Sequence, residues 1–311
     1  MTSQHGQMEQ ALGEGRMAVV VEYSPPVVAD ADAVRAMAAA VRGKADAVGV
    51  LDNHLEIMMS AIATAALLRA EGVEPIVHAT TRDRNRIALI SDVLGARALG
   101  LRNFLCTSGD HQTLGRERAS RNVFDLDSVQ LISVLNHMRR DGILFETSRP
   151  IEPCDLYLGA TANPFADPQE MHTIQLTKKI QAGADFIVTQ PVFDVGGFGQ
   201  WLQSLRGLGI VEKAAILVGI LVPSSDAEAR EISRKMPGVE APEAIISRIA
   251  SAPPARQRDE AIAIAAELIA GLRALDGVRG FYLMTGRDTN AALELIERSL
   301  KSKVQSPRSK V

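Results

Sequence analysis

The sequence has few cysteines, few aromatic residues and no excess of positive charge, and each shortage excludes a class of protein. Cys106 and Cys154 are the only cysteines among 311 residues, and neither belongs to a CxxC or Cys/His cluster. A disulfide scaffold is therefore excluded, and reduced thiols in the cytoplasm are expected. Because 34 basic residues face 37 acidic ones, the net charge of −3 gives no reason to expect nucleic acid or an anionic membrane as a partner.

Several functional motifs are also missing. No apolar run approaches the roughly 20 residues needed to cross a bilayer, and the first residues contain no apolar core of a signal peptide. The sequence has no P-loop, no GxGxxG that opens a helix, no GxSxG and no HExxH. Its six histidines form no HxH pair, so we expect no metal site.

Apolar runs typical of buried strands alternate with stretches of helical spacing. Strands are expected at residues 17–23, 47–51, 75–79, 103–108, 156–161, 186–190, 215–220 and 280–284. Helices are expected between them, one of them over Leu55, Met58, Met59, Ile62 and Ala66, which recur at helical spacing.

Strict alternation of strands and helices predicts an α/β fold with a parallel sheet. Eight such units favour a closed (β/α)8 TIM barrel, and a doubly wound open sheet is the second possibility. We expect residues 1–311 to form a single domain with frayed ends at about 1–12 and 302–311.

In such a barrel the active site lies at the carboxyl ends of the strands, so the polar residues there are candidates. Glu22 closes the first strand before two prolines, either as a functional acid or as a rim carboxylate paired with an arginine. Asp110 follows Gly109 after the fourth strand, in a pair that is also common in turns. Gln190 ends the sixth strand, where its amide either pairs with an amide-like ring edge or merely terminates the strand.

Two further groups suit an anionic ligand. His78 ends the third strand and is followed by hydroxyl side chains and two arginines, a mixture that fits either a diphosphate or an N-cap with solvated charges. Lys178 and Lys179 lie late in the fifth helix, where they either complement the helix dipole or contact a phosphate.

At these positions the sequence resembles the methylenetetrahydrofolate reductase family, from about residue 17 to 300. The resemblance rests on the segments VEYSPP, HATTRDRN, TSGD and KKIQAGADFIVTQPVFD, in the family's order and spacing. The segment VFDLDSVQLI also resembles the one before the family's fourth helix. These segments are closest to a divergent branch found in acetogens and in fused methyltransferase–reductase proteins.

The resemblance implies a flavoprotein that interconverts 5,10-methylenetetrahydrofolate and 5-methyltetrahydrofolate, with NADH or NADPH as co-substrate. FAD is the expected flavin, although FMN or no tightly bound flavin also fits, and family precedent predicts a homo-oligomer. The same resemblance is compatible with a folate- and flavin-binding subunit that needs a partner protein for electrons, and with an oxidative-direction enzyme of methyl-group catabolism. A barrel lyase or aldolase is disfavoured because no lysine ends a predicted strand.

The resemblance also implies roles for individual residues. Glu22 corresponds to the general acid, Asp110 to an aspartate near flavin and pterin, and Gln190 to a glutamine that contacts folate. The cofactor-binding residues it implies are His78, Thr80, Ser108, Gly109, Asp110, Asp125, Ala160, Asn163, Ala166, Gln175, Lys178 and Lys179. The substrate-binding residues it implies are Gln190, Phe193, Glu228 and Arg287. Opening the folate ring requires a proton, so burial that raises the pKa of Glu22 is expected.

Overall fold

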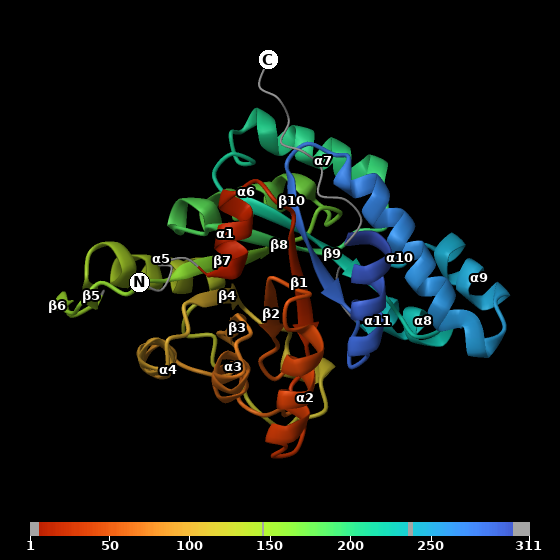
Figure 1. Cartoon of the computed structure of the whole chain (residues 1–311). Helices are drawn as coiled ribbons and strands as arrows, with labels where there is room; N and C mark the ends of the chain where they lie inside the picture. The colour runs from red at the N-terminus through yellow and green to blue at the C-terminus, as the bar shows by residue number, and fades with distance from the viewer. Residues whose placement is uncertain (1–5, 145, 236–238, 301–311) are drawn as a thin grey trace.

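Eight parallel strands close into a barrel in the computed structural model, which describes residues 6–144, 146–235 and 239–300 (Figure 1). Their order around the barrel is β1-β10-β9-β8-β7-β4-β3-β2, which confirms the predicted (β/α)8 class and excludes the open sheet. The strands are β1 (Ala18–Tyr23), β2 (Ala47–Val50), β3 (Pro75–Thr80), β4 (Asn103–Thr107), β7 (Tyr157–Ala162), β8 (Phe186–Pro191), β9 (Ala215–Leu221) and β10 (Val278–Met284).

Helices surround the barrel and begin at polar N-caps in several cases. The side chains of Asp30, Asn85, Asp127, Asp194 and Asp288 each accept a backbone N–H of the first turn. The helices are α2 (Ala31–Val41), α3 (Ala61–Ala70), α4 (Arg86–Ala98), α5 (Ser128–Arg140), α6 (Gln169–Ala182), α7 (Val195–Gly207), α8 (Asp226–Lys235), α9 (Glu243–Ser251), α10 (Gln257–Arg273) and α11 (Thr289–Leu295).

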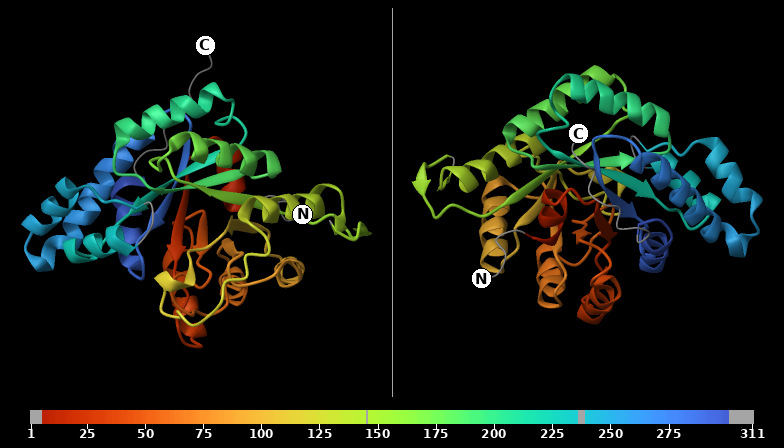
Figure 2. Two further views of the ribbon diagram at one scale, coloured as in Figure 1. Left: turned by 180° about the vertical axis from the view of Figure 1, so that it is seen from behind. Right: turned by 45° about the horizontal axis from the view of Figure 1, so that its top comes forward.

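Short elements complete the described part of the chain. They are the 3-10 turns η1 (Gln112–Leu114) and η2 (Pro254–Arg256), the π-helical turn η3 (Ile296–Leu300) and a hairpin of β5 (Ile143–Leu144) with β6 (Arg149–Pro150). The hairpin and the α8–α9 segment project on opposite sides of the barrel (Figure 2). None of the helices in the described ranges is both long and apolar enough to span a membrane.

The alternation of side chains along each strand determines which residues face the interior of the barrel. Ala18 and Val20 of β1 belong to the interior cluster, whereas Val19 and Val21 pack outward with the helices. Because side chains repeat every two residues along a strand, Glu22 also points inward, at the carboxyl end of β1. The same period places polar residues at the carboxyl ends of the neighbouring strands above an apolar interior.

Helix α1 (Gln7–Gly13) fills the amino-terminal end of the barrel. Met8, Ala11 and Leu12 are buried and pack into the interior cluster. We expected a frayed chain up to about residue 12, and from Gln7 onward that prediction is wrong, because these apolar side chains close the bottom of the core. The other expected frayed end, residues 302–311, lies outside the described residues.

The predicted helix starting near Leu55 is wrong in its first turns. Helix α3 begins at Ala61, after the N-cap Ser60. Asn53 and Leu55 have φ of 49° and 61°, a left-handed conformation that no α-helix accommodates. The apolar residues between them and Ser60 therefore belong to a long loop at the carboxyl end of β2, not to a helix face.

Replacing Met8 with alanine should lower the free energy of unfolding by about 2–5 kcal/mol, because its fully buried side chain would leave a cavity. Urea unfolding measures this change. The matched control is Gln10→Ala on the exposed face of the same helix, which should change stability by less than about 0.5 kcal/mol. Equal effects of the two substitutions would contradict the packing of α1 against the barrel.

Candidate active site

A cavity of about 780 Å³ opens at the carboxyl ends of the strands. Side chains from every strand or the loop after it line this cavity, and its volume lies in the upper part of the range of about 300–1,000 Å³ typical of small-molecule sites. The predicted site residues that it brings together are Glu22, His78, Thr80, Ser108, Gly109, Asp110, Gln175, Lys178, Lys179, Gln190 and Glu228. The structure thus gathers most of the predicted residues in one place.

The remaining predicted residues lie elsewhere. Asn163 lines a side cavity of about 170 Å³ that shares Gln175, Lys179 and Gln190 with the main one. The side chain of Ala160 is fully buried and packs outward with the helices. The other predicted residues outside the main cavity lining are Asp125, Ala166, Phe193 and Arg287.

Asp125 and Arg287 have protein partners. The Asp125 carboxylate accepts hydrogen bonds from the backbone N–H and the guanidinium of Arg86, at 2.9–3.0 Å. Arg287 donates to Glu56 at 2.6 Å, and Glu56 also lies 3.3 Å from Arg116. Neither residue belongs to the lining of the main cavity, so their predicted contacts to cofactor and folate stay predictions.

The side-chain carboxyl of Glu22 is half protonated near neutral pH. Its carboxyl forms a hydrogen bond with the Tyr282 hydroxyl. Burial raises the pKa of Glu22 from 4.5 to about 7, and the charge of His54 and the hydrogen bond with Tyr282 oppose this rise. Desolvation therefore outweighs the stabilising contacts.

Next to Glu22, Tyr282 and His78 form a buried hydrogen-bonded pair. The Tyr282 hydroxyl lies 2.8 Å from Nε2 of His78. Burial lowers the pKa of His78 to about 3, so the imidazole is neutral, and it raises the pKa of Tyr282 well above 10. Gly49 on β2 makes room for the phenol, because a Cβ there would collide with the Tyr282 hydroxyl. When Tyr282 donates to the Glu22 carboxylate, His78 can donate its Nε2–H to the phenol oxygen.

Asp110 has the opposite electrostatic character. Its Oδ2 lies 3.6 Å from Nε2 of His54, and this close polar contact holds the pKa of Asp110 below its usual value. Gly109, with φ of 81°, forms the turn that precedes it, and a Cβ there would collide with Thr80. The Gly-Asp pair is therefore both a turn and a means of placing an ionised carboxylate in the cavity.

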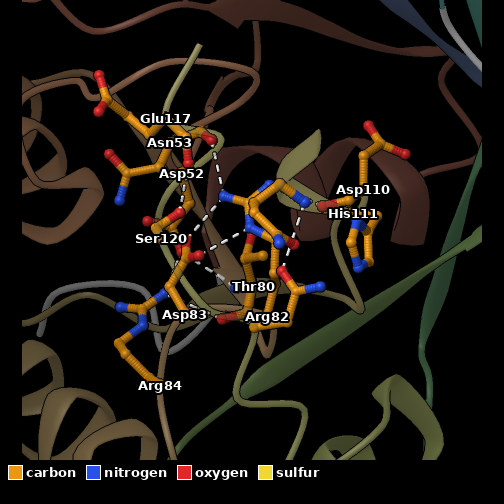
Figure 3. A network of polar contacts seen from close by, with 12 residues as sticks. Asp52, Asn53, Thr80, Arg82, Asp83, Arg84, Asp110, His111, Glu117 and Ser120 are labelled. Atoms are coloured by element: carbon orange, nitrogen blue, oxygen red, sulfur yellow. Dashed lines mark hydrogen bonds and ion pairs between the residues drawn. The ribbon is translucent and has the colours of Figure 1, made fainter. Parts of the chain in front are cut away.

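The two arginines after β3 bind protein groups (Figure 3). Arg82 donates to Asp83 at 2.7 Å, to the carbonyl oxygen of Asp110 at 3.0 Å and to that of Asn53 at 2.9 Å. These bonds use every nitrogen of its guanidinium and connect the loops after β2, β3 and β4.

Arg84 is neutralised in the same way. It pairs with the buried Asp52 and with Asp92, the latter at 2.8 Å. Asp52 also accepts the backbone N–H of Thr80 at 3.1 Å, and burial raises its pKa despite the neighbouring charge of Arg84. The interpretation that these arginines hold a diphosphate is therefore not supported by their contacts, because each is already bound to carboxylates.

Cationic side chains on α6 remain available to a ligand. Lys178 and Lys179 line the cavity beside Gln175 and Thr161. The Lys179 amine donates to the Thr161 carbonyl oxygen at 2.7 Å, and burial lowers its pKa. An anionic group of a ligand would therefore be expected at this wall.

Sequence reasoning missed several polar residues of the cavity, of which Tyr282 and His54 matter most to its chemistry. The two-residue period of the last strand directs Tyr282 into the barrel and could have identified this residue from the sequence. His54 was missed because a helix was expected to begin beside it, at Leu55, where the structure has a loop. The cavity also has an apolar wall that was not predicted, formed by Leu221, Val222, Ile232, Val239 and Met284.

The raised pKa of Glu22 predicts a pH-dependent stability. Between about pH 4.5 and 7 its carboxyl ionises readily in the unfolded chain but not in the folded one, so stability falls as the pH rises through this range. Glu22→Gln removes this effect and should stabilise the protein at pH 8 by up to about 3 kcal/mol, with little gain at pH 4.5.

Urea unfolding at the two pH values tests this prediction. Glu212→Gln, in an exposed turn, is the matched control and should show no such pH dependence. A Glu22→Gln effect that is the same at both pH values would contradict the raised pKa.

Comparison with known proteins shows which family the chain resembles. The family model for methylenetetrahydrofolate reductase matches residues 7–300. A probable methylenetetrahydrofolate reductase (NADPH) from Caenorhabditis elegans is 24% identical over 215 residues, or 68% of this chain. The match covers 29% of that protein, so this chain corresponds to less than a third of its length.

Solved structures share the barrel at low sequence identity. An uncharacterized protein from Clostridium thermocellum that binds two copies of 5-methyl-5,6,7,8-tetrahydrofolic acid has a TM-score of 0.63 and 13% identity, over 93% of this chain and 97% of that one. A putative lyase/mutase from Burkholderia cenocepacia J2315 has a TM-score of 0.50 and 16% identity, over 94% and 84%. At such identities these structures show the fold alone. Because the family model extends over nearly the whole chain, the protein belongs to the methylenetetrahydrofolate reductase family, as its sequence segments predicted.

Proposed function

We propose that this chain interconverts 5,10-methylenetetrahydrofolate and 5-methyltetrahydrofolate by flavin-mediated hydride transfer, with NADH or NADPH as donor. The observation that carries the proposal is Glu22, an acid with a pKa of about 7 in the same cavity as the ionised Asp110. Membership of the family and a cavity large enough for a pterin beside a cofactor support it.

The two carboxyl groups match the two demands of the reaction. Glu22 donates a proton to N10 of the substrate, which breaks the bond between N10 and the methylene carbon and leaves an iminium cation at N5. Asp110, held ionised by His54, stabilises this cation electrostatically. The Gln190 amide can both donate to and accept from the pterin edge. Each turnover thus consumes one proton and one hydride, and the methylene carbon becomes a methyl group.

The residues of the α6 wall fit a flavin with one phosphate. A bound flavin would supply the hydride, taken from the nicotinamide. Lys178 and Lys179 would hold the phosphate, and Gln175 and Ser108 offer polar groups along the same cavity. Because the arginines after β3 are bound to carboxylates, the lining offers little charge for a second phosphate. This charge distribution favours FMN over the FAD that the family resemblance implied.

The visible spectrum of the purified protein, with FMN or FAD added, tests the cofactor. We expect flavin absorbance that NADH or NADPH bleaches without oxygen, and tighter binding of FMN than of FAD. Flavin that stays oxidised with both nucleotides but reacts with dithionite would favour the subunit that receives electrons from a partner protein. Absence of flavin binding would contradict the proposed cofactor.

Glu22→Gln should separate the two half-reactions. The variant is expected to keep flavin reduction by the nicotinamide and to lose reduction of methylenetetrahydrofolate by about 100- to 10,000-fold, because the proton donor is gone. Stopped-flow absorbance measures each step separately, and Glu212→Gln should leave both unchanged. Folate reduction that survives in Glu22→Gln would refute the assignment of the acid.

A further inference from the structure

Arg82 lies at the edge of the cavity, yet its guanidinium is bound to the protein itself. Its side chain is only 8% exposed. Of the five N–H groups that an arginine offers, two donate to the Asp83 carboxylate, one to the carbonyl oxygen of Asn53 and one to that of Asp110 (Figure 3). Four of its donors are thus used within the protein, although Arg82 belongs to the lining of a cavity that suits a ligand.

The bonds of Arg82 serve two different purposes. The two bonds to Asp83, both 2.7 Å long, balance the charge of the buried cation. The bonds to the carbonyl oxygens of Asn53 and Asp110, 2.9 Å and 3.0 Å long, connect the loops after β2 and β4. Because a planar guanidinium presents its donors in a fixed fork, it holds both oxygens in one defined geometry.

The backbone at both attachment points has an unusual conformation. Asn53 has a φ of 49°, which costs about 1–3 kcal/mol for a residue with a side chain and persists where surrounding contacts impose it. Gly109, directly before Asp110, has a φ of 81°, and a Cβ there would lie 3.1 Å from the Cβ of Arg82. The missing side chain of Gly109 therefore lets the loop after β4 approach Arg82 closely.

The segment that carries Asp110 is attached to Arg82 a second time. Residues 108–127 connect β4 with α5, and near their end the backbone N–H of Val123 donates to the Arg82 carbonyl oxygen at 2.7 Å. Arg82 thus binds this long segment near its beginning through the guanidinium and near its end through the backbone. These two attachments restrain the loop from which the Asp110 side chain projects into the cavity.

We propose that Arg82 is a positioning residue that sets the place of the Asp110 carboxylate by holding the backbone that carries it. Because an aspartate side chain is short, the place of its carboxylate in the cavity follows closely from the place of its backbone. The catalytic meaning of this restraint rests on the proposed function, in which Asp110 stabilises the cationic intermediate. The anchoring of the loop by Arg82 does not rest on it.

Arg84 offers a matched control on the same loop. Its guanidinium also binds carboxylates, those of Asp52 and Asp92, and it donates to the Thr80 carbonyl oxygen at 3.3 Å. None of these three partners belongs to the segment that carries Asp110. Replacing Arg84 with lysine should therefore disturb a comparable set of bonds without moving Asp110.

Arg82→Lys keeps the charge but loses the fork of donors. The kcat of methylenetetrahydrofolate reduction should fall by about 10- to 100-fold, because a small misplacement of a catalytic group has an effect of this size. The KM for the folate and the rate of flavin reduction should change little, since the lost interaction acts in the transition state of the folate step. Arg84→Lys should leave both steps unchanged. Equal losses in the two steps, or the same loss in Arg84→Lys, would indicate a merely structural arginine and overturn the proposal.

A double-mutant cycle with Asp110→Asn tests whether Arg82 acts through Asp110. If it does, Arg82→Lys should cause no further loss of kcat in the Asp110→Asn background, because the group that it positions is already gone. Losses that simply add in the double variant would contradict a role that runs through Asp110.

Hydrogen–deuterium exchange measures the anchoring without turnover. In Arg82→Lys the backbone N–H groups of residues 109–123 should exchange about tenfold faster, because the loop opens more easily once its donors are lost. Gly109→Ala, whose new Cβ would push this loop away from Thr80 and Arg82, is a second variant that should show the same change. Arg84→Lys should not.

The exchange experiment separates the two proposals. Faster exchange in Arg82→Lys, in a protein that reduces no methylenetetrahydrofolate, would refute the proposed function and leave the anchoring by Arg82 in place. Unchanged exchange in both Arg82→Lys and Gly109→Ala would overturn the inference about Arg82, whatever the activity of the protein.

Discussion

The desolvation of one carboxyl group at the mouth of the barrel is the constraint on which the site depends. The two-residue period of β1 continues from Ala18 and Val20 to Glu22, so an acid enters the layer where the apolar interior ends. Burial there raises its pKa to about 7, against an opposing hydrogen bond from Tyr282. On the neighbouring strand β2, Gly49 has no side chain and therefore leaves space for the Tyr282 hydroxyl. A single strand-end acid thus explains a glycine, a tyrosine and a neutral histidine on three other strands.

Near Glu22, the charged side chains of the loop after β3 are bound to other protein groups. Arg82 and Arg84 bind carboxylates and loop carbonyl oxygens, and they connect the ends of β2, β3 and β4. Their role is to hold the loops in place, and among the described residues this leaves Lys178 and Lys179 as the cations of the ligand wall on α6. The resulting cavity is lined by the carboxylate of Asp110 on one side and by the amines of Lys178 and Lys179 on another. A helix that closes the opposite end of the barrel through Met8 keeps the interior apolar beneath both.

The sequence predicted the strand alternation and the polar strand ends well, because both follow from periods of two and 3.6 residues. Glu22, Asp110 and Gln190 could be named because they end apolar strands or follow them within a short turn. The pairing of Arg82 and Arg84 could not, since their partners come from other strands and loops that meet only in the closed barrel. His54 was missed because Leu55, Met58 and Met59 imitate a helix face, whereas left-handed residues form a loop there. The single-domain organisation, the homo-oligomer and the cytoplasmic location stay predictions.

Infrared spectroscopy can measure the protonation state of Glu22 itself. The difference between the spectra of the protein and of its Glu22→Gln variant isolates the carbonyl band of this protonated carboxyl, which can be followed from about pH 4 to 9. With a pKa of about 7 for Glu22, this band should persist at pH 6 and disappear with a midpoint near pH 7. A band that is already gone at pH 6, with a midpoint near the ordinary value of 4.5, would contradict the raised pKa of Glu22.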